Sequence, residues 1–266
     1  MNTAQDDAGE ALAARVDALL RALHLPGALT RHRELCAESG TGEPLLRMLE
    51  DILEAEIGSR EQHRYERNLR AARFPVVKEL AGFDFSAIPS LPRGRVEDLA
   101  KGQFIAAHET VLLIGNPGTG KSHVLLALGL EAVRQGYRVR FVTAATLVGE
   151  LLLARQELRV PKLLKQYGGF DLVAVDELGY VPFSREAGQL LFEFFSDRYE
   201  RRATALTTNL PFAQWPQVFG DETMTVALLD RLTHRSHVLM FNGDSYRMRD
   251  SRRRAQGESR IVAAKS

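Results

Sequence analysis

The chain has 266 residues, a formal net charge of +1, 45% hydrophobic residues and 26% charged residues. This composition is ordinary for a globular protein with a packed core, and it excludes a disordered chain, which would combine low hydrophobicity with high net charge. The length allows one large domain, or a main domain of about 180 residues with a smaller companion.

Cysteine content and hydropathy indicate the cellular compartment in which the protein is expected. Cys36 is the only cysteine, so the sequence excludes an internal disulfide and a zinc site built from thiolates, which fits a reducing environment. We find neither a secretory signal nor a run of about eighteen apolar residues. We therefore expect a cytoplasmic protein with no membrane partner.

The first part of the chain has a helical pattern. From Glu10 to Arg73, leucine, alanine and long polar residues recur at three- and four-residue spacing. Breaks at Pro26-Gly27, at Gly40 to Gly42 and at Gly58 predict about four helices. Pro75 is expected to end the last helix, because a proline disfavours helical geometry in the residue before it.

Beyond Glu97 short apolar strands alternate with helices. The expected strands are 111–114, 139–143, 172–175, 204–207 and 238–241, and the expected helices are 122–135, 144–156, 184–201 and a stretch from 226. This alternation predicts parallel strands with helices on both faces of the sheet. The fold class is therefore α/β, with a small all-helical domain in front.

These changes of pattern divide the chain into four parts. The divisions are an N-terminal helical domain at 1–75, a linker at 76–96, the strand-and-helix domain at 97–250 and a basic tail at 251–266. The tail and the segment 60–73 carry most of the clustered arginines, so local basic surfaces are expected to meet phosphates.

Residues 115–122 spell Gly-Asn-Pro-Gly-Thr-Gly-Lys-Ser between an apolar strand and a helix. The glycines let the main chain curl, so that backbone N–H groups and the positive end of the helix surround phosphate oxygens. Lys121 is expected to reach the β- and γ-phosphates of ATP, and the Ser122 hydroxyl to ligate Mg²⁺. The predicted ATP-binding residues are Gly115, Asn116, Pro117, Gly118, Thr119, Gly120, Lys121, Ser122 and His123.

The apolar strand expected at residues 172–175 ends in two carboxylates, Asp176 and Glu177. At the carboxyl edge of a parallel sheet, Asp176 would lie beside the phosphate loop and help to hold Mg²⁺. Glu177 would then polarise the water that attacks the terminal phosphate. An aspartate followed by a glutamate after a strand is often only a solvated turn, but its position downstream of a phosphate loop favours ATP hydrolysis.

Two further residues are candidates for the hydrolytic reaction. Asn209 follows the strand at 204–207 and would orient the water or the γ-phosphate; the alternative is that it caps the turn before Pro211. Arg231 lies near the end of the nucleotide-binding unit, where an arginine can reach the site of a neighbouring subunit. Its alternative is a surface ion pair with Asp230.

Taken together, these residues resemble the IstB family, the ATPase helper proteins of bacterial insertion sequences, which are similar in turn to the DnaC helicase loaders of the AAA+ class. The segments that carry the resemblance are 25–27, 70–75, 83–85, 115–123, 136–143, 176–180, 230–232 and 245–247. Asp-Glu-Leu-Gly-Tyr at 176–180 combined with Arg-Ala-Ala-Arg-Phe-Pro at 70–75 is specific, whereas the glycine loop is shared by many nucleoside triphosphatases. The resemblance implies an AAA+ ATPase domain at 97–250.

The resemblance also implies a function. ATP would drive assembly of several subunits, as a ring or helix, on target duplex DNA, and the assembly would recruit or stimulate a cognate transposase. Arginines spaced by three or four residues would contact DNA phosphates from one helical face, unless they form a solvated face paired with Glu61 and Glu66. These arginines are Arg60, Arg64, Arg67, Arg70 and Arg73.

Three other functions remain open. A replicative helicase loader like DnaC would share the catalytic residues but favour single-stranded DNA. A small-molecule kinase would need a substrate lid with arginines behind the phosphate loop, and no such segment is evident. A nucleotide-gated DNA scaffold would turn ATP over very slowly, only for release.

Overall fold

The computed structural model describes residues 3–39, 43–180, 183–243 and 245. By their contacts the residues form two compact units, 1–66 and 67–266. The predicted tail at 251–266 lies outside the described residues. In the part of the chain that is described, none of the helices combines the length and the apolar character needed to cross a lipid bilayer.

Three helices begin the chain: α1 (Thr3–Ala22), α2 (Pro26–Ser39) and α3 (Glu43–Ala72). The prediction of about four helices is wrong, because Gly58 lies inside α3. A glycine in a helix costs only about 1 kcal/mol relative to alanine, too little to end a helix whose apolar side chains pack against a neighbour. In the first unit those side chains include Leu53, which packs with Val16, Leu20 and Leu23.

Replacing Gly58 with alanine is expected to stabilise α3 by about 0.5–1 kcal/mol. A Cβ atom at this position would meet no other atom within 4 Å, so the added methyl group is free of clashes. Native-state hydrogen exchange of α3 amides in the full chain measures the change. Gly129→Ala is the contrasting variant, because its Cβ would lie 3.0 Å from the Phe74 ring. In this variant the amides around Gly58 should exchange no more slowly than in the unchanged protein.

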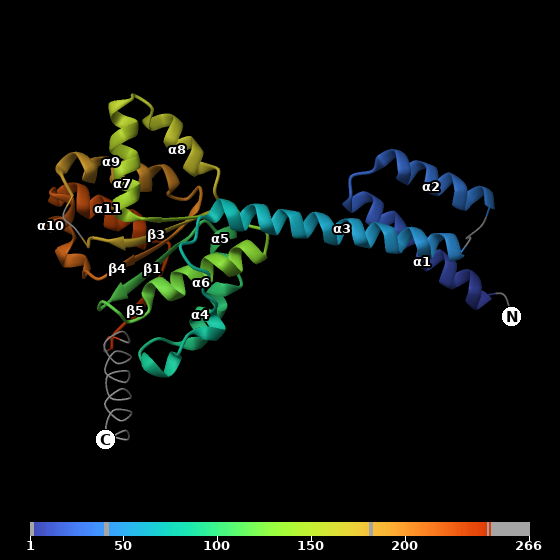
Figure 1. Ribbon diagram of the computed structural model, residues 1–266, viewed down its shortest axis with the longest axis horizontal. Helices are drawn as coiled ribbons and strands as arrows, with labels where there is room; N and C mark the ends of the chain where they lie inside the picture. The colour runs from blue at the N-terminus through green and yellow to red at the C-terminus, as the bar shows by residue number, and fades with distance from the viewer. Residues whose placement is uncertain (1–2, 40–42, 181–182, 244, 246–266) are drawn as a thin grey trace, which may run out of the picture. The chain divides into compact units, whose positions relative to one another are not determined.

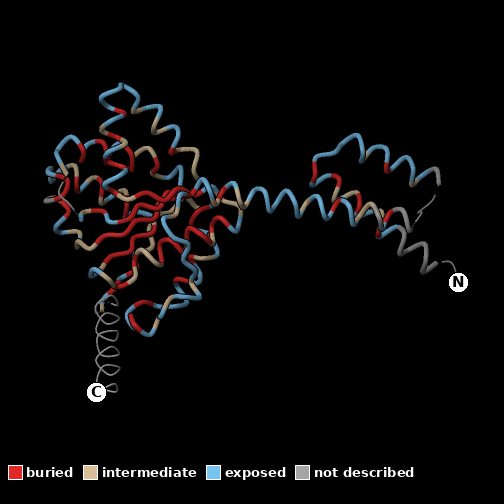
Figure 2. The backbone as a smooth tube through the Cα atoms, viewed as in Figure 1, coloured by how far each residue is buried: buried red, intermediate tan, exposed pale blue. Residues whose placement is uncertain are grey.

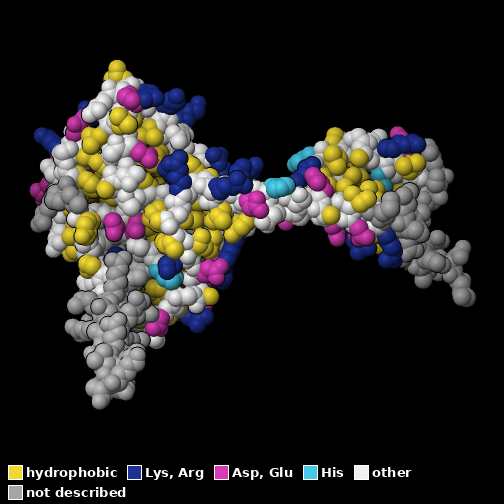
Figure 3. Space-filling view, viewed as in Figure 1, with side chains coloured by type: hydrophobic (Ala, Val, Ile, Leu, Met, Phe, Trp, Pro, Cys, Tyr) yellow, Lys and Arg dark blue, Asp and Glu magenta, His cyan; other side chains and the backbone are white. Residues whose placement is uncertain are grey.

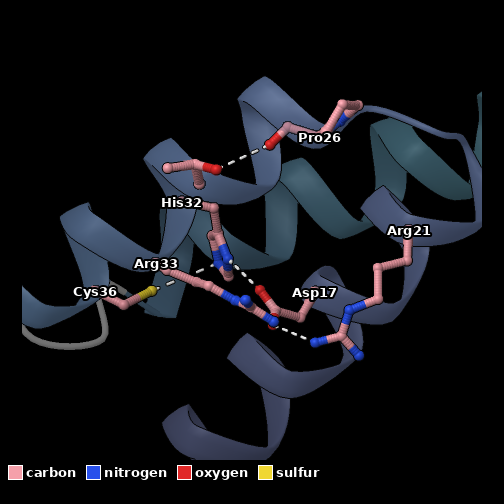
Figure 4. Close-up of polar contacts among 7 residues, drawn as sticks. Asp17, Arg21, Pro26, His32, Arg33 and Cys36 are labelled. Atoms are coloured by element: carbon pink, nitrogen blue, oxygen red, sulfur yellow. Dashed lines mark hydrogen bonds and ion pairs between the residues drawn. The ribbon is translucent and has the colours of Figure 1, made fainter.

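A polar cluster joins α1 to α2 in the first unit (Figure 4). The carboxylate of Asp17 accepts hydrogen bonds from the Arg33 guanidinium at 2.7 and 2.9 Å, and it lies 3.0 Å from Nδ1 of His32. The bond from Arg33 is the largest cause that holds the pKa of Asp17 below its ordinary value. Cys36 lies on the same helix as His32, with its sulfur 3.5 Å from Nε2, so this contact of the thiol lies within α2.

The second unit is built on a five-stranded parallel sheet (Figure 1). The strands are β1 (Thr110–Gly115), β2 (Val139–Thr143), β3 (Leu172–Leu178), β4 (Ala203–Thr208) and β5 (Ser236–Phe241). Their order across the sheet is β2-β3-β4-β1-β5. The strands β1 to β4 are largely buried, and the edge strand β5 is partly exposed (Figure 2). The α/β fold class with a parallel sheet is therefore confirmed.

Helices cover both faces of this sheet (Figure 1). They are α4 (Arg93–Ala100), α5 (Gln103–Ala106), α6 (Lys121–Arg134), α7 (Ala144–Gln156), α8 (Val160–Gly168), α9 (Arg185–Arg198), α10 (Trp215–Phe219) and α11 (Glu222–His234). Short 3-10 turns occupy Leu80–Gly82, Phe85–Ala87 and Phe212–Gln214. One face is covered by α6, and the other packs a large apolar core from β1, β3 and β4 against α7, α9 and α11.

The second unit begins at Arg67, earlier than the predicted domain boundary at residue 75. Asn68 is 5% exposed, and its side-chain amide donates to the carbonyls of Gly136 and Tyr137 at 3.0 and 3.3 Å. The Phe74 ring packs edge-on against Phe141 of β2. These long-range contacts bind the end of α3 and the residues just after it to the sheet domain.

Candidate active site

The phosphate loop joins β1 to α6 and depends on glycines. Gly115 and Gly120 have φ angles of 149° and 91°, in the region that side chains disfavour. A Cβ at Gly115 would lie 2.2 Å from the carbonyl oxygen of Phe241, and one at Gly120 would lie 2.6 Å from the Phe83 ring. The loop is therefore enclosed by the end of β5 and by the segment before α4.

Lys121 is the first residue of α6, and its side chain turns back into the loop. It is 8% exposed, and its Nζ atom donates to the carbonyl oxygens of Gly115 and Asn116, both at 2.7 Å. Thr119, also buried, donates to the same Asn116 carbonyl at 2.8 Å. The loop thus holds a fixed cation at the positive end of a helix, which is the arrangement that suits a polyphosphate.

Asp176 is the centre of the polar network at the carboxyl edge of the sheet. Its Oδ1 atom accepts a hydrogen bond from the Ser122 hydroxyl at 2.9 Å and another from the Thr207 hydroxyl. Asp176 is 7% exposed, so this carboxylate is held among its donors. Hydroxyl and carboxylate oxygens are hard ligands of the kind that Mg²⁺ prefers. Because these two oxygens lie 2.9 Å apart, Ser122 and Asp176 fit the magnesium ion that they are predicted to hold.

Glu177 has an unusual backbone conformation. Its φ angle is +62°, and the register of β3 against β4 shifts between Val175 and Leu178. Such a bulge redirects a side chain, and a left-handed non-glycine residue costs about 1–3 kcal/mol, a cost that is common at functional sites. The Glu177 side chain is exposed, whereas its backbone N–H donates to the Thr207 hydroxyl at 2.9 Å. Thus the two neighbouring carboxylates face different surroundings.

The strand order explains why these residues meet. Because β4 lies between β1 and β3, the end of β4 lies between the phosphate loop and Asp176. Asn209 follows β4 there, as predicted from the sequence. The turn after the strand is bridged by Thr208, whose hydroxyl accepts from the N–H of Leu210 at 3.1 Å. The side-chain hydrogen bond that caps this turn is therefore made by Thr208, the residue before Asn209.

Thr207 was missed by the sequence analysis as a site residue. It belongs to β4, which consists of three threonines, two alanines and a leucine and is buried throughout, and it is 2% exposed. A threonine near the end of a buried strand was the available signal, but only the placement of β4 beside β3 brings it to Asp176 and Glu177.

A pocket of about 510 Å³ adjoins the phosphate loop. One wall is Gly118, Thr119, Gly120, Ser122 and His123, and the other comes from residues 76–88. His123, predicted to bind ATP, lies 2.9 Å through its Nε2 from the carbonyl of Glu79 and contacts the Phe83 ring edge-on. The pocket is within the size range of small-ligand sites and extends the loop toward apolar side chains.

Arg231 lies far from this network. Its guanidinium stacks 4.6 Å from the centre of the Phe192 ring and donates to the Ser196 hydroxyl at 3.2 Å, both on α9. It also lines a small cavity with Thr110 and Thr204, which lie at the amino ends of β1 and β4. Arg231 is therefore at the opposite edge of the sheet from Asp176.

The five arginines predicted to contact DNA are all exposed. Arg60, Arg64, Arg67 and Arg70 lie within α3, but Arg73 follows its end with a φ of +54°, so the prediction of one helical face for all five is wrong. Arg60 also pairs with Glu56 at 2.6 Å and donates to the carbonyl of Leu23. The helix ends before Arg73 because the left-handed backbone there, followed by Phe74-Pro75, cannot continue it.

Known proteins resemble this chain over most of its length. A family model described as IstB-like ATP binding protein matches residues 18–254. The "Insertion sequence IS21 putative ATP-binding protein" of Pseudomonas aeruginosa is 40% identical over 201 residues, 76% of each chain. A similarly named protein of insertion sequence IS5376 from Geobacillus stearothermophilus is 33% identical over 239 residues, 90% of this chain and 95% of that one.

Two solved structures share the fold of the second unit. DnaI matches with a TM-score of 0.52 at 18% identity, over 62% of this chain and 91% of that chain. The replication initiator DnaA, bound to AMPPCP and single-stranded DNA, matches with a TM-score of 0.50 at 18% identity, over 62% of this chain and only half of that chain. The fold is thus the P-loop fold of the AAA+ type, and the chain belongs to the family of IstB-like ATP-binding proteins.

Proposed function

We propose that this protein is a transposition helper ATPase: it binds ATP with Mg²⁺, assembles on target duplex DNA, hydrolyses the ATP, and recruits or stimulates its cognate transposase. The observation that carries the proposal is the meeting of Lys121, Ser122, Asp176 and Glu177 at one edge of the sheet. Membership of a family of ATP-binding proteins, with relatives named for insertion sequences, supports it.

Each residue of the site has a task in this proposal. Lys121 and the loop N–H groups hold the phosphates, while Ser122 and Asp176 hold Mg²⁺, which would neutralise charge on the phosphate oxygens. Glu177 accepts a hydrogen bond from the attacking water and polarises it, and Asn209 orients that water or the γ-phosphate. Arg231 serves the site of a neighbouring subunit in the assembly.

Exposed basic side chains support contact with the DNA backbone. Those of α3 recur through residues 60–70, and Arg73 lines a groove of about 560 Å³ in the second unit together with Arg159 and Lys162. Figure 3 shows Lys and Arg side chains gathered over α8, where Lys162 lies. Glu150 and Glu157 also line this groove, so its charge is mixed, with four basic and two acidic lining residues.

Imaging of particles by negative stain tests the assembly. The protein is mixed with duplex DNA, with single-stranded DNA or with neither, each with and without a slowly hydrolysed ATP analogue. We expect ordered rings or helices only when duplex DNA and nucleotide are both present. A chain that stays a monomer in every mixture contradicts the proposal, and assembly only on single strands favours a helicase loader.

Salt dependence tests the arginines of α3. Affinity for duplex DNA is expected to fall steeply with salt, and Arg64→Ala combined with Arg67→Ala should weaken binding for all sequences and reduce the slope of log K against log salt by about 1 per arginine. Arg93→Ala is the matched control, because Arg93 is exposed on α4 and paired with Glu97. An affinity insensitive to salt, or an equal loss in the control, contradicts phosphate contact by α3.

A further inference from the structure

Thr207 links the two carboxylate residues of the site. Its hydroxyl donates to Oδ1 of Asp176 and accepts the backbone N–H of Glu177 at 2.9 Å. We propose that Thr207 is a positioning residue for hydrolysis, which fixes the Asp176 carboxylate and holds the Glu177 backbone so that its side chain is aimed at the attacking water. This inference rests on the proposed ATPase function and adds a residue to which no catalytic task was assigned.

The direction of both hydrogen bonds follows from the hydrogen count. A threonine hydroxyl has one proton and two lone pairs, and an ionised carboxylate only accepts. Because the Glu177 N–H must be the donor in its bond to Oγ1, the single hydroxyl proton is left to point at Asp176. The hydroxyl therefore has one orientation. Through it, the single side chain of Thr207 connects the carboxylate of Asp176 to the backbone of Glu177.

The location of Thr207 makes this link rigid. It is 2% exposed in β4, whose backbone is paired with β1 through Leu113 on one side and with β3 on the other. A β-branched side chain in a strand has few available rotamers, so the hydroxyl is held without much loss of entropy. The strand that ends at Asn209 thus also supports the strand that carries Asp176 and Glu177.

The Glu177 backbone needs such support. Its φ of +62° is costly for a residue with a Cβ atom, and the register shift around it removes regular pairing with β4 at this point. The bond from its N–H to Thr207 replaces a ladder hydrogen bond. Without the hydroxyl, Glu177 is expected to relax toward ordinary strand geometry, which turns its side chain away from its present direction.

The test compares three variants of the full chain. Thr207→Val removes the hydroxyl but keeps the shape of the side chain, and Thr207→Ser keeps the hydroxyl. Thr204→Val is the matched control: Thr204 is 3% exposed near the start of the same strand, and its hydroxyl accepts from Nε of Arg198 at 3.2 Å. Both valine variants therefore lose one buried threonine hydroxyl from β4, but at opposite edges of the sheet.

We expect Thr207→Val to lower kcat for ATP hydrolysis by about 10–100-fold, the usual effect of removing a group that orients a catalytic ligand. Binding of a fluorescent ATP analogue should be retained, Thr207→Ser should restore most of the rate, and Thr204→Val should hydrolyse ATP like the unchanged protein. Hydrogen exchange without nucleotide gives a second measurement, in which the Glu177 amide exchanges faster in Thr207→Val only.

The outcomes separate this inference from the proposed function. If the unchanged protein does not hydrolyse ATP, the ATPase proposal fails, while the exchange of the Glu177 amide still tests the link. If the unchanged protein is active and Thr207→Val matches it in kcat and in exchange, the inference is overturned. An equal loss of rate in both valine variants also overturns it, because that result reflects general damage to β4.

Discussion

Glu177→Gln is expected to retain ATP binding while lowering the rate of hydrolysis by about 10²–10⁴-fold, the range attributed to a general base. Glutamine has the same shape as glutamate but cannot take up a proton from water. The backbone of Glu177, with its φ of +62° and its N–H bonded to Thr207, does not depend on the carboxylate. The change therefore removes one chemical property and leaves the site intact.

Two comparisons make this experiment specific. Lys121→Ala should lose ATP binding as well as hydrolysis, because the buried Nζ atom in the loop is the cation that meets the phosphates. Glu97→Gln should change neither, since Glu97 is exposed on α4 and pairs with Arg93. Binding of a labelled nucleotide and release of phosphate are measured on the same preparations. Undiminished hydrolysis by Glu177→Gln would remove this residue from its proposed task.

Local patterns were sufficient for most of the sheet. Each expected strand is present, and β2 has the predicted bounds of Val139 to Thr143. A short apolar run between polar turns in an α/β chain is typical of a buried strand. β3 extends to Leu178, beyond the predicted end at Val175, since pairing with β4 resumes after the bulge. No property of Asp176 or Glu177 taken alone indicates that bulge.

The helical segment contains one wrong prediction and one that is nearly right. Gly58 was expected to end a helix, yet the apolar contacts of Leu49, Leu53 and Ile57 in the turns before it outweigh its poor propensity. At the other end of α3 the local signal was nearly sufficient: the helix stops at Ala72, close to the end predicted from Pro75, and Arg73 falls just outside it with a left-handed backbone. Packing between distant segments decided the case of Gly58, whereas the proline signal decided the end of the helix.

Sequence motifs predicted some residues of the candidate site but not others. The glycine loop and the two carboxylates lie where the sequence placed them, because a phosphate loop after one strand and an acidic end of another must share the carboxyl edge of a parallel sheet. Thr207 required the strand order, which is a property of the whole sheet. The contacts of Arg231 with Phe192 and Ser196 likewise join helices that are distant in the sequence.

Arg231→Ala is expected to reduce ATP hydrolysis by about 10³–10⁵-fold, as when an arginine that neutralises transition-state charge is removed. A neighbouring subunit that keeps Arg231 should restore the lost hydrolysis. Arg231 lies at the amino edge of the strands, and strands of this length span about 20 Å, so it cannot reach the Asp176 end of its own sheet. A neighbouring subunit packed head to tail would bring that edge to the phosphate loop.

Mixing two inactive variants tests this arrangement. Lys121→Ala subunits lack a working loop but keep Arg231, and Arg231→Ala subunits have the reverse defect. In an equal mixture that assembles at random, about a quarter of head-to-tail interfaces would join an intact loop to an intact arginine, so hydrolysis should reappear and be greatest near equal amounts. Phosphate release is measured across mixing ratios in the presence of duplex DNA.

The matched control is a chain that carries both Lys121→Ala and Arg231→Ala, mixed with the Lys121→Ala chain, because no interface in that mixture has an intact loop. Its activity should stay at the background level. If the two single variants also stay inactive at every ratio, Arg231 does not act between subunits. Its stacking on Phe192 and its bond to Ser196 would then describe a structural contact between α11 and α9, and the loss of activity in Arg231→Ala should be accompanied by a lower Tm.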